Sequence, residues 1–194
     1  MARRSKLFKR WRRWLLAIIL LSGLWAFYER WRSHRESRQD KVILAAAERY
    51  EVDAALIKAV VWRESWFDPW ARGRAGEIGL MQVGDLAAQE WADAEQIPSF
   101  VHSQLFDPAQ NTLAGTWYLR KALRRYGQTD NPLPYSLAEY NAGRANVLKW
   151  ATGAAATNSA TVTELIGFPG TKAYVKSVMQ RYAYYQPVFP PPAK

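Results

Sequence analysis

The residue best suited to chemistry in this sequence is Glu64, a carboxylate at the end of an apolar run. Residues 60–62, just before Arg63, are Val, Val and Trp. An apolar setting disfavours the charged carboxylate and so raises the pKa of the acid. An acid that stays protonated near neutral pH can donate its proton to a glycosidic oxygen. The alternative interpretation is a surface glutamate that pairs with Arg63.

Short motifs follow Glu64-Ser65 in a set order along the chain. They are Gly79-Leu80-Met81-Gln82, then Asp107-Pro108 with Asn111, Gly115 and Trp117-Tyr118-Leu119, then Glu139-Tyr140-Asn141-Ala142-Gly143, and last Tyr174-Val175. Each motif is weakly specific alone. Together they resemble the lytic transglycosylases, whose catalytic domain is related to goose-type lysozyme, over residues 42–185. The resemblance implies an all-α, lysozyme-like catalytic domain.

The resemblance assigns the chemistry to a small set of residues. It implies that Glu64 is the single catalytic acid/base and that no cofactor or metal takes part. It implies substrate binding by Gly79, Leu80, Met81, Gln82, Tyr140, Asn141 and Tyr174. The segment at residues 79–82 would line the cleft, with the side chains of Met81 and Gln82 facing sugar. Residues 140 and 141 would form the opposite wall, and the Tyr174 hydroxyl would approach the catalytic carboxyl.

Each of these side chains also has a purely structural interpretation. Met81 can fill the core, and Tyr140 and Tyr174 can be packed aromatic residues. Asn141 can end a helix just before Gly143, because Asn and Gly are common at helix C-termini. Residue types alone leave these alternatives open.

Two positions depart from the pattern of the family. The family often has a serine nine residues after the catalytic glutamate, in contact with substrate, but this sequence has Gly73. A proline usually stands two residues after the glutamine of the second motif. This sequence has Gly84 there, followed by Asp85 as a possible helix cap. We expect these changes to affect substrate affinity and subsite detail more than the type of reaction.

The expected reaction follows from a single carboxylate. Most glycosidases flank the scissile bond with two carboxyl groups, and Glu77 and Glu139 are the nearest candidates for a second one. One carboxyl suffices if Glu64 protonates the leaving oxygen and then deprotonates the C6 hydroxyl of the sugar itself, an intramolecular attack. With this chemistry, the resemblance implies a peptidoglycan lytic transglycosylase that cleaves the MurNAc–GlcNAc β-1,4 bond and leaves 1,6-anhydroMurNAc ends.

Three other functions compete with this prediction. A lysozyme-type muramidase on the same fold would need a positioned water and a second carboxylate. A weakly active peptidoglycan-binding protein of the cell envelope is kept open by Gly73. A small basic membrane protein without enzyme activity is disfavoured by the ordered motifs.

The composition excludes several classes of protein. The net charge is +10, but residues 1–41 carry 12 Lys/Arg and 3 Asp/Glu, while residues 42–194 carry 15 and 14. The part expected to fold is therefore nearly neutral and lacks the basic surface that nucleic-acid binding needs. With no Cys and only two His, neither a disulfide framework nor a structural zinc site is expected.

Residues 14–28 form a run of 15 residues without charge, after seven basic residues at positions 3–13. As a helix the run rises about 22 Å, less than the ~30 Å hydrocarbon core, although flanking Arg and Lys can extend its effective length. We expect a retained membrane anchor rather than a cleaved signal peptide or an interfacial helix, because no cleavage site is evident. The basic N-terminus then stays cytoplasmic, and the remaining chain faces the periplasm or cell wall.

Helical periodicity dominates the rest of the chain. We expect helices over residues 42–50, 53–65, 80–91, 107–127, 134–142 and 171–185, with capping by Asp53 and Asp107 and an exposed loop at residues 152–164. The predicted parts are a basic tip and anchor (1–28), a charged linker or helical extension (29–40), the catalytic domain (41–186) and a Pro-rich tail (187–194).

Overall fold

The computed structural model describes residues 2–189, apart from the side chains of residues 2–10, 12 and 13. The chain divides into two units, Met1–Arg38 and Gln39–Lys194. The seven basic side chains predicted for the N-terminal tip lie outside the described side chains, and so does most of the predicted Pro-rich tail.

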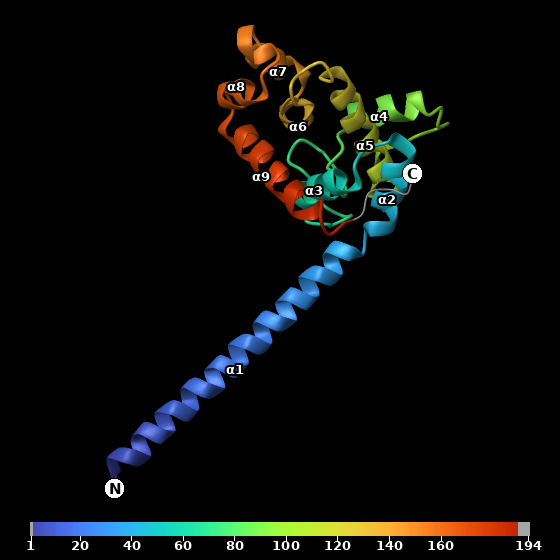
Figure 1. Ribbon diagram of the computed structural model, residues 1–194. Coiled ribbons are helices and arrows are strands. Elements are labelled where there is room, and N and C mark those ends of the chain that lie inside the picture. The colour runs from blue at the N-terminus through green and yellow to red at the C-terminus, as the bar shows by residue number, and fades with distance from the viewer. Residues whose placement is uncertain (1, 190–194) are drawn as a thin grey trace. The chain divides into compact units, whose positions relative to one another are not determined.

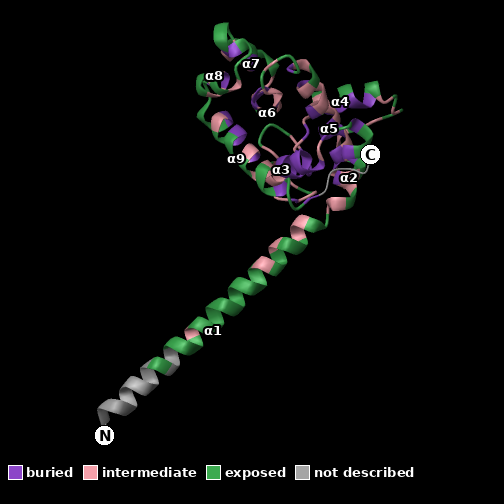
Figure 2. Ribbon diagram, viewed as in Figure 1, coloured by how far each residue is buried: buried purple, intermediate pink, exposed green. Residues whose placement is uncertain are grey.

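The first unit is one long helix, α1 (Ala2–Ser37), so the charged segment after the apolar run is helical rather than a loose linker. Most residues of the run are exposed (Figure 2, green). Leu15, Ile18, Leu21 and Trp25, for example, are 54–67% exposed. Within the described residues no helix is both long and apolar enough to cross a membrane. The predicted transmembrane anchor is therefore not confirmed, since its uncharged run spans only about 22 Å.

The second unit is built from helices (Figure 1), and the prediction of an all-α domain is confirmed. Over its described residues, 39–189, β-structure is limited to isolated bridges that Ile78 makes to Arg72 and Val83. The helices are α2 (Asp40–Tyr50), α3 (Ala54–Ser65), α4 (Asp85–Ala94), α5 (Pro108–Arg125), α6 (Pro132–Ala142), α7 (Arg144–Trp150), α8 (Ser159–Leu165) and α9 (Pro169–Tyr185), with 3-10 turns η1 (His102–Phe106) and η2 (Gly153–Ala156).

Helix α3 lies at the centre of this unit, packed against α2 and α9 (Figure 1). Its residues Ala54 to Val61 are all buried, as expected for a helix that is apolar on every side. Even Lys58 is only 6% exposed, and it pairs with Asp40 of α2. The helix is consequently a rigid support for the residues at its C-terminal end.

Two of the predicted helix caps are present. The Asp53 carboxylate accepts from Ala55 N (2.8 Å) at the start of α3. The Asp107 carboxylate accepts from Gln110 N (2.9 Å) at the start of α5, where Pro108 occupies the first turn. Such caps satisfy N–H groups that the helix itself leaves unpaired.

The helix predicted from residue 80 is wrong, because α4 begins only at Asp85. Ile78 and Val83 exchange backbone hydrogen bonds of 3.2 and 3.1 Å, which closes a tight turn. Within this turn Gln82 has φ 47°, in the left-handed region. Asp85 lies in the first turn of α4 rather than at its cap, which is Gly84.

The exposed loop predicted over residues 152–164 is also wrong, since η2 and α8 occupy most of it. Asn158 caps α8 by accepting from Thr161 N (2.8 Å). Val162 is buried within the core cluster, and α8 packs against α6. The small polar residues of this segment therefore form a short helix because a tertiary partner covers its one buried residue, Val162.

Asn111 of α5 holds the turn at residues 78–83 in place. Its Oδ1 accepts from Met81 N (2.7 Å), and its Nδ2 donates to Ile78 O (2.8 Å) and Leu105 O (2.9 Å). Gly79, at φ 79°, lies so close that a Cβ there would overlap the Asn111 amide. One buried amide thus bonds three backbone groups and holds the turn against η1 and α5.

We expect Asn111→Ala to lower the free energy of unfolding by about 3 kcal/mol or more, because it leaves buried backbone groups without partners. Denaturant unfolding measures this change. The matched control is Gln110→Ala in the next position of α5, whose side chain forms no hydrogen bond to a described residue. A loss in Asn111→Ala no larger than in the control would contradict this role.

Candidate active site

Glu64 lies in the last turn of α3, with its side chain partly buried. The next residue, Ser65, donates from Oγ to Leu80 O (2.7 Å), which joins the end of α3 to the turn at residues 78–83. The chain then leaves the helix through Trp66, at φ 55°. The Glu64 carboxyl is therefore held at a point where a buried helix meets a constrained turn.

The hydroxyl of Tyr174 donates to Glu64 Oε1 at 2.6 Å. Tyr174 lies in α9 and is fully buried, and its ring faces the Arg63 guanidinium at 5.4 Å. Burial and the neighbouring Glu64 hold the pKa of Tyr174 well above its usual value, so the phenol keeps the proton that it donates. The predicted approach of this hydroxyl to the carboxyl is present, and its effect on chemistry stays a prediction.

Burial raises the pKa of Glu64 from 4.5 to about 7. The Tyr174 hydrogen bond and the positive charge of Arg63 lower this pKa, whereas the negative charge of Glu77 raises it. Desolvation therefore dominates over the groups that stabilise the carboxylate. At neutral pH the carboxyl can both give and take a proton, as a general acid/base must.

Tyr140 of α6 approaches the same carboxyl. Its hydroxyl donates to Met81 O (2.8 Å), and its ring meets the edge of Tyr118 with centroids 5.8 Å apart. Burial raises the pKa of Tyr140, and the next contribution comes from the charge of Glu64. Tyr140 thus connects the turn at residues 78–83 to α5 and α6 beside the acid.

The expectation that the side chain of Met81 faces sugar is wrong. Met81 is 0% exposed, and its sulfur accepts from Thr116 Oγ1 at 3.8 Å. It packs so closely on Gly115 of α5 that a Cβ there would lie 2.6 Å from the sulfur. Leu80 is also completely buried. These two side chains anchor the turn in the core.

The side chain of Gln82 forms hydrogen bonds mainly with backbone carbonyl groups. Its Nε2 donates to Ala71 O (3.2 Å) and Gly79 O (2.9 Å), which ties the turn to the preceding loop. Asn141 is exposed and accepts from Thr171 Oγ1 (2.8 Å), which connects α6 to the start of α9. Of the two polar side chains expected to bind substrate, Asn141 is therefore the more accessible.

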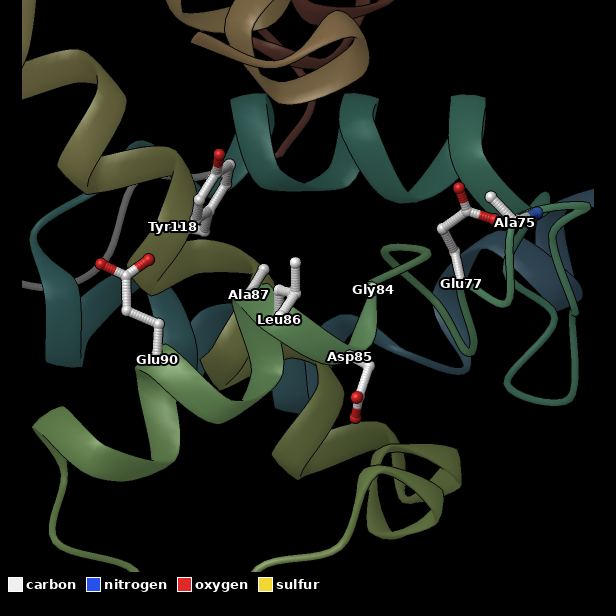
Figure 3. Close-up of a pocket in the computed structure, with 8 residues that line it drawn as sticks. All are labelled: Ala75, Glu77, Gly84, Asp85, Leu86, Ala87, Glu90 and Tyr118. Carbon is white, nitrogen blue, oxygen red and sulfur yellow. Dashed lines mark hydrogen bonds between the residues drawn. The ribbon is translucent and has the colours of Figure 1, made fainter. Parts of the chain in front are cut away.

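A pocket of about 440 Å³ opens between the loop before the turn, the start of α4 and α5 (Figure 3). It is lined by Ala75, Glu77, Gly84, Asp85, Leu86, Ala87, Glu90 and Tyr118. Tyr118 also contacts Tyr140, so the pocket adjoins the site around Glu64. In the sequence, Tyr118 is part of the helix motif Trp117-Tyr118-Leu119, and nothing in that motif indicates this pocket.

The two candidates for a second carboxylate have different surroundings. Glu139 is 2% exposed, forms an ion pair with Arg125 and accepts from the Tyr126 hydroxyl (2.7 Å). It therefore serves as a buried link between α5 and α6. Glu77 lines the pocket and its charge acts on Glu64. Among residues 2–189 with described side chains, no group of three or more acidic or His side chains is arranged to hold a metal ion.

The family model described as "Transglycosylase SLT domain" matches residues 41–162. The chain is 36% identical over 109 residues to membrane-bound lytic murein transglycosylase F of Desulfosudis oleivorans, a match that covers 55% of this chain and 22% of that protein. It is 32% identical over 138 residues to soluble lytic murein transglycosylase of Escherichia coli K12, covering 70% of this chain and 21% of that protein. The chain thus spans about a fifth of these relatives.

Solved structures show the same fold. The 70 kDa soluble lytic transglycosylase of Escherichia coli superposes with a TM-score of 0.67 at 28% identity, covering 75% of this chain and 24% of that one. An inactive Glu-to-Gln mutant of lytic transglycosylase Slt from Pseudomonas aeruginosa gives 0.68 at 26% identity, covering 76% and 24%. A complex of the 70-kDa soluble enzyme with bulgecin A gives 0.68 at 27%, covering 84% and 29%. The lysozyme-like helical fold is confirmed.

We expect Tyr174→Phe to raise the pKa of Glu64 further above 7, because the lost hydrogen bond stabilises the carboxylate. NMR titration of the 13C-labelled Glu64 carboxyl measures this shift. Tyr182→Phe is the matched control, since Tyr182 lies in the same helix but donates to Asp53 (2.7 Å). An unchanged or lower pKa of Glu64 in Tyr174→Phe would show that the hydroxyl does not support the charged form.

Proposed function

This chain belongs to the transglycosylase SLT domain family, and on that premise we propose that it is a peptidoglycan lytic transglycosylase. It cleaves the MurNAc–GlcNAc β-1,4 bond without water and leaves 1,6-anhydroMurNAc ends. The observation that carries the proposal is the partly buried carboxyl of Glu64, bound at Oε1 by Tyr174 and with a pKa of about 7. The names of the two murein transglycosylases similar to this chain support the same substrate.

In the first step, protonated Glu64 donates its proton to the glycosidic oxygen as the C1–O bond of MurNAc breaks. The raised pKa of Glu64 keeps a substantial fraction of the acid protonated at neutral pH. The carboxylate left behind is stabilised by the Tyr174 hydroxyl at 2.6 Å. Positive charge that develops on the sugar also favours the carboxylate, because the two opposite charges lie in a poorly solvated site.

In the second step, Glu64 takes the proton of the C6 hydroxyl of the same MurNAc while the oxygen of that hydroxyl bonds to C1. The proton returns to the carboxyl, so the enzyme is ready for a further cycle and no water is consumed. Intramolecular attack replaces a second molecule with a group already held near C1, which removes much of the entropic barrier. One carboxyl group therefore accounts for both proton transfers.

The substrate-binding set is part of the same proposal. Tyr140 and Asn141 present one wall of the cleft from α6, and Gln82 borders the other from the turn. Gly79, Leu80 and Met81 act through backbone, because the side chains of Leu80 and Met81 are buried. Their contribution to binding is the shape of the turn rather than contact by side chains.

We expect Glu64→Gln to abolish glycan cleavage while the protein remains folded, because the amide is nearly isosteric but cannot transfer a proton. Removing a general acid costs about 100- to 10,000-fold, and here the same group also acts as base. Digestion of purified murein followed by mass analysis measures both rate and product. The control is Glu48→Gln, an exposed carboxylate of α2.

Activity of folded Glu64→Gln near that of the wild type would reject Glu64 as the acid. Wild-type products with reducing ends instead of anhydro ends would favour a muramidase, in which Glu77 could activate a water. Murein binding without any fragments from the wild type would favour a peptidoglycan-binding protein instead.

We also propose that α1 attaches the chain to the cytoplasmic membrane through residues 14–28, with the SLT domain on the periplasmic or cell-wall side. Exposed apolar side chains surround this stretch of the helix, and burying them in lipid is favourable. Trp14, Trp25 and Tyr28 stand at its ends, where aromatic rings suit the headgroup region. One similar protein is named as membrane-bound.

We expect Ile18→Asp/Leu21→Asp to move the full-length protein from the membrane fraction to the soluble fraction. Each Asp within an apolar membrane segment costs about 3 kcal/mol. Fractionation with salt, carbonate and detergent washes measures attachment. Leu148→Asp is the control, because Leu148 is a similarly exposed leucine (53%) in α7. Wild-type protein that stays soluble without detergent would reject the attachment.

A further inference from the structure

Gly73 is a glycine because of space rather than backbone conformation. It does not lie in the left-handed region that favours glycine, unlike Gly76 and Gly79 at φ 94° and 79°. A Cβ built at position 73 would overlap Glu77 Oε2 and would lie 2.9 Å from Gln82 Oε1. Any other residue would fit the backbone here, but it would displace the carboxyl of Glu77.

The carboxyl of Glu77 is held over Gly73 by the loop itself. Gly73 N donates to Glu77 O (2.7 Å), and Ala75 N donates to Glu77 Oε2 (3.0 Å). Glu77 is partly buried and forms no ion pair with a residue whose side chain the structure describes. A partly buried carboxylate has more acceptor positions than this one backbone hydrogen bond fills, and a ligand with hydroxyl or N–H groups would supply donors for them.

Glu77 faces the pocket described above, at the opposite end from Tyr118 and with the first turn of α4 between them (Figure 3). Tyr118 contacts Tyr140, which in turn lies beside Glu64. Glu90, the other acid at the Tyr118 end, is paired with Lys121. Of the three pocket carboxylates, Glu77, Asp85 and Glu90, Glu77 is the one whose charge acts on Glu64. Asp85 lies 3.9 Å from the His102 ring.

We propose that Glu77 is a substrate-contacting residue whose carboxylate accepts hydrogen bonds from the hydroxyl or N-acetyl N–H groups of an amino sugar bound in this pocket. Gly73 makes this possible by leaving the space that the carboxyl occupies. The inference rests on the proposed function, because it assigns a sugar subsite next to Glu64. The negative charge of Glu77 has a second effect, which is to favour the protonated form of Glu64 by electrostatic repulsion.

Two substitutions separate a purely structural role of Glu77 from the proposed role in substrate binding. The hydrogen bond from Ala75 N needs only an acceptor oxygen, and the amide of glutamine supplies one. Glu77→Gln therefore keeps the loop while it removes the charge. Gly73→Ala has the opposite effect, since it keeps the charge but forces the carboxyl out of its position.

The test measures steady-state cleavage of soluble, uncrosslinked murein glycan strands by the full chain. We expect KM to rise about tenfold or more in both Glu77→Gln and Gly73→Ala, as for a lost hydrogen bond to a charged group. In Glu77→Gln we also expect the alkaline limb of kcat to move to lower pH. The groups acting on the Glu64 carboxyl are Tyr174, Arg63 and Glu77, and removing the negative one makes Glu64 lose its proton at lower pH.

The controls match each change. Glu48→Gln removes one exposed carboxylate from α2, and Gly170→Ala adds a methyl group with nothing within 4 Å. Neither should alter KM or the pH profile. An unchanged KM in Glu77→Gln with full cleavage by the wild type would overturn this inference and leave the proposed function intact. A lower melting temperature with unchanged KM and pH profile would show that Glu77 only braces the loop. Cleavage that survives in Glu64→Gln would instead reject the proposed function.

Discussion

The burial of α3 is the constraint on which the site depends. A buried helix that packs against α2 and α9 carries Glu64 in its last turn, where apolar core gives way to surface. Desolvation therefore acts on the carboxyl more strongly than any group that would stabilise its charge, and it raises the pKa to about 7. Moving Glu64 one turn outward would expose it to water and remove this effect.

The surrounding polar residues act mostly on the backbone. Asn111, Gln82 and Ser65 each bond to carbonyl or N–H groups of the segment at residues 71–81, and Tyr140 bonds to Met81 O. The turn at residues 78–83 has backbone hydrogen bonds of its own between Ile78 and Val83 and from Gln82 N to Gly79 O, and these side chains add to them. The residue types of the motif at residues 79–82 suggest contacts with sugar, but the motif serves largely to hold a turn in one shape. The turn therefore presents a rigid wall rather than a set of mobile side chains.

The Glu77 carboxyl occupies the space that a side chain at position 73 would need. The absent side chain at residue 73 and the folded-back carboxyl at residue 77 fit together, and the loop hydrogen bonds favour this arrangement. Negative charge near Glu64 opposes its ionisation, whereas Tyr174 and Arg63 favour it. Burial therefore makes the largest contribution to the pKa of Glu64, and the neighbouring groups adjust it.

The sequence by itself determined the helical class and most helix limits, and it pointed to Glu64 as the candidate acid. Periodicity, the caps at Asp53 and Asp107 and the apolar run before Glu64 are local signals, and local physics was enough to interpret them. Only the tertiary structure decided that Met81 packs inward, that Gln82 holds backbone and that Glu77 reaches over Gly73. It also decided that residues 80–84 form a turn and that α8 is a helix. Such outcomes depend on partners distant in sequence, which include Asn111, Gly115 and α6, and periodicity carries no information about which distant segments will meet.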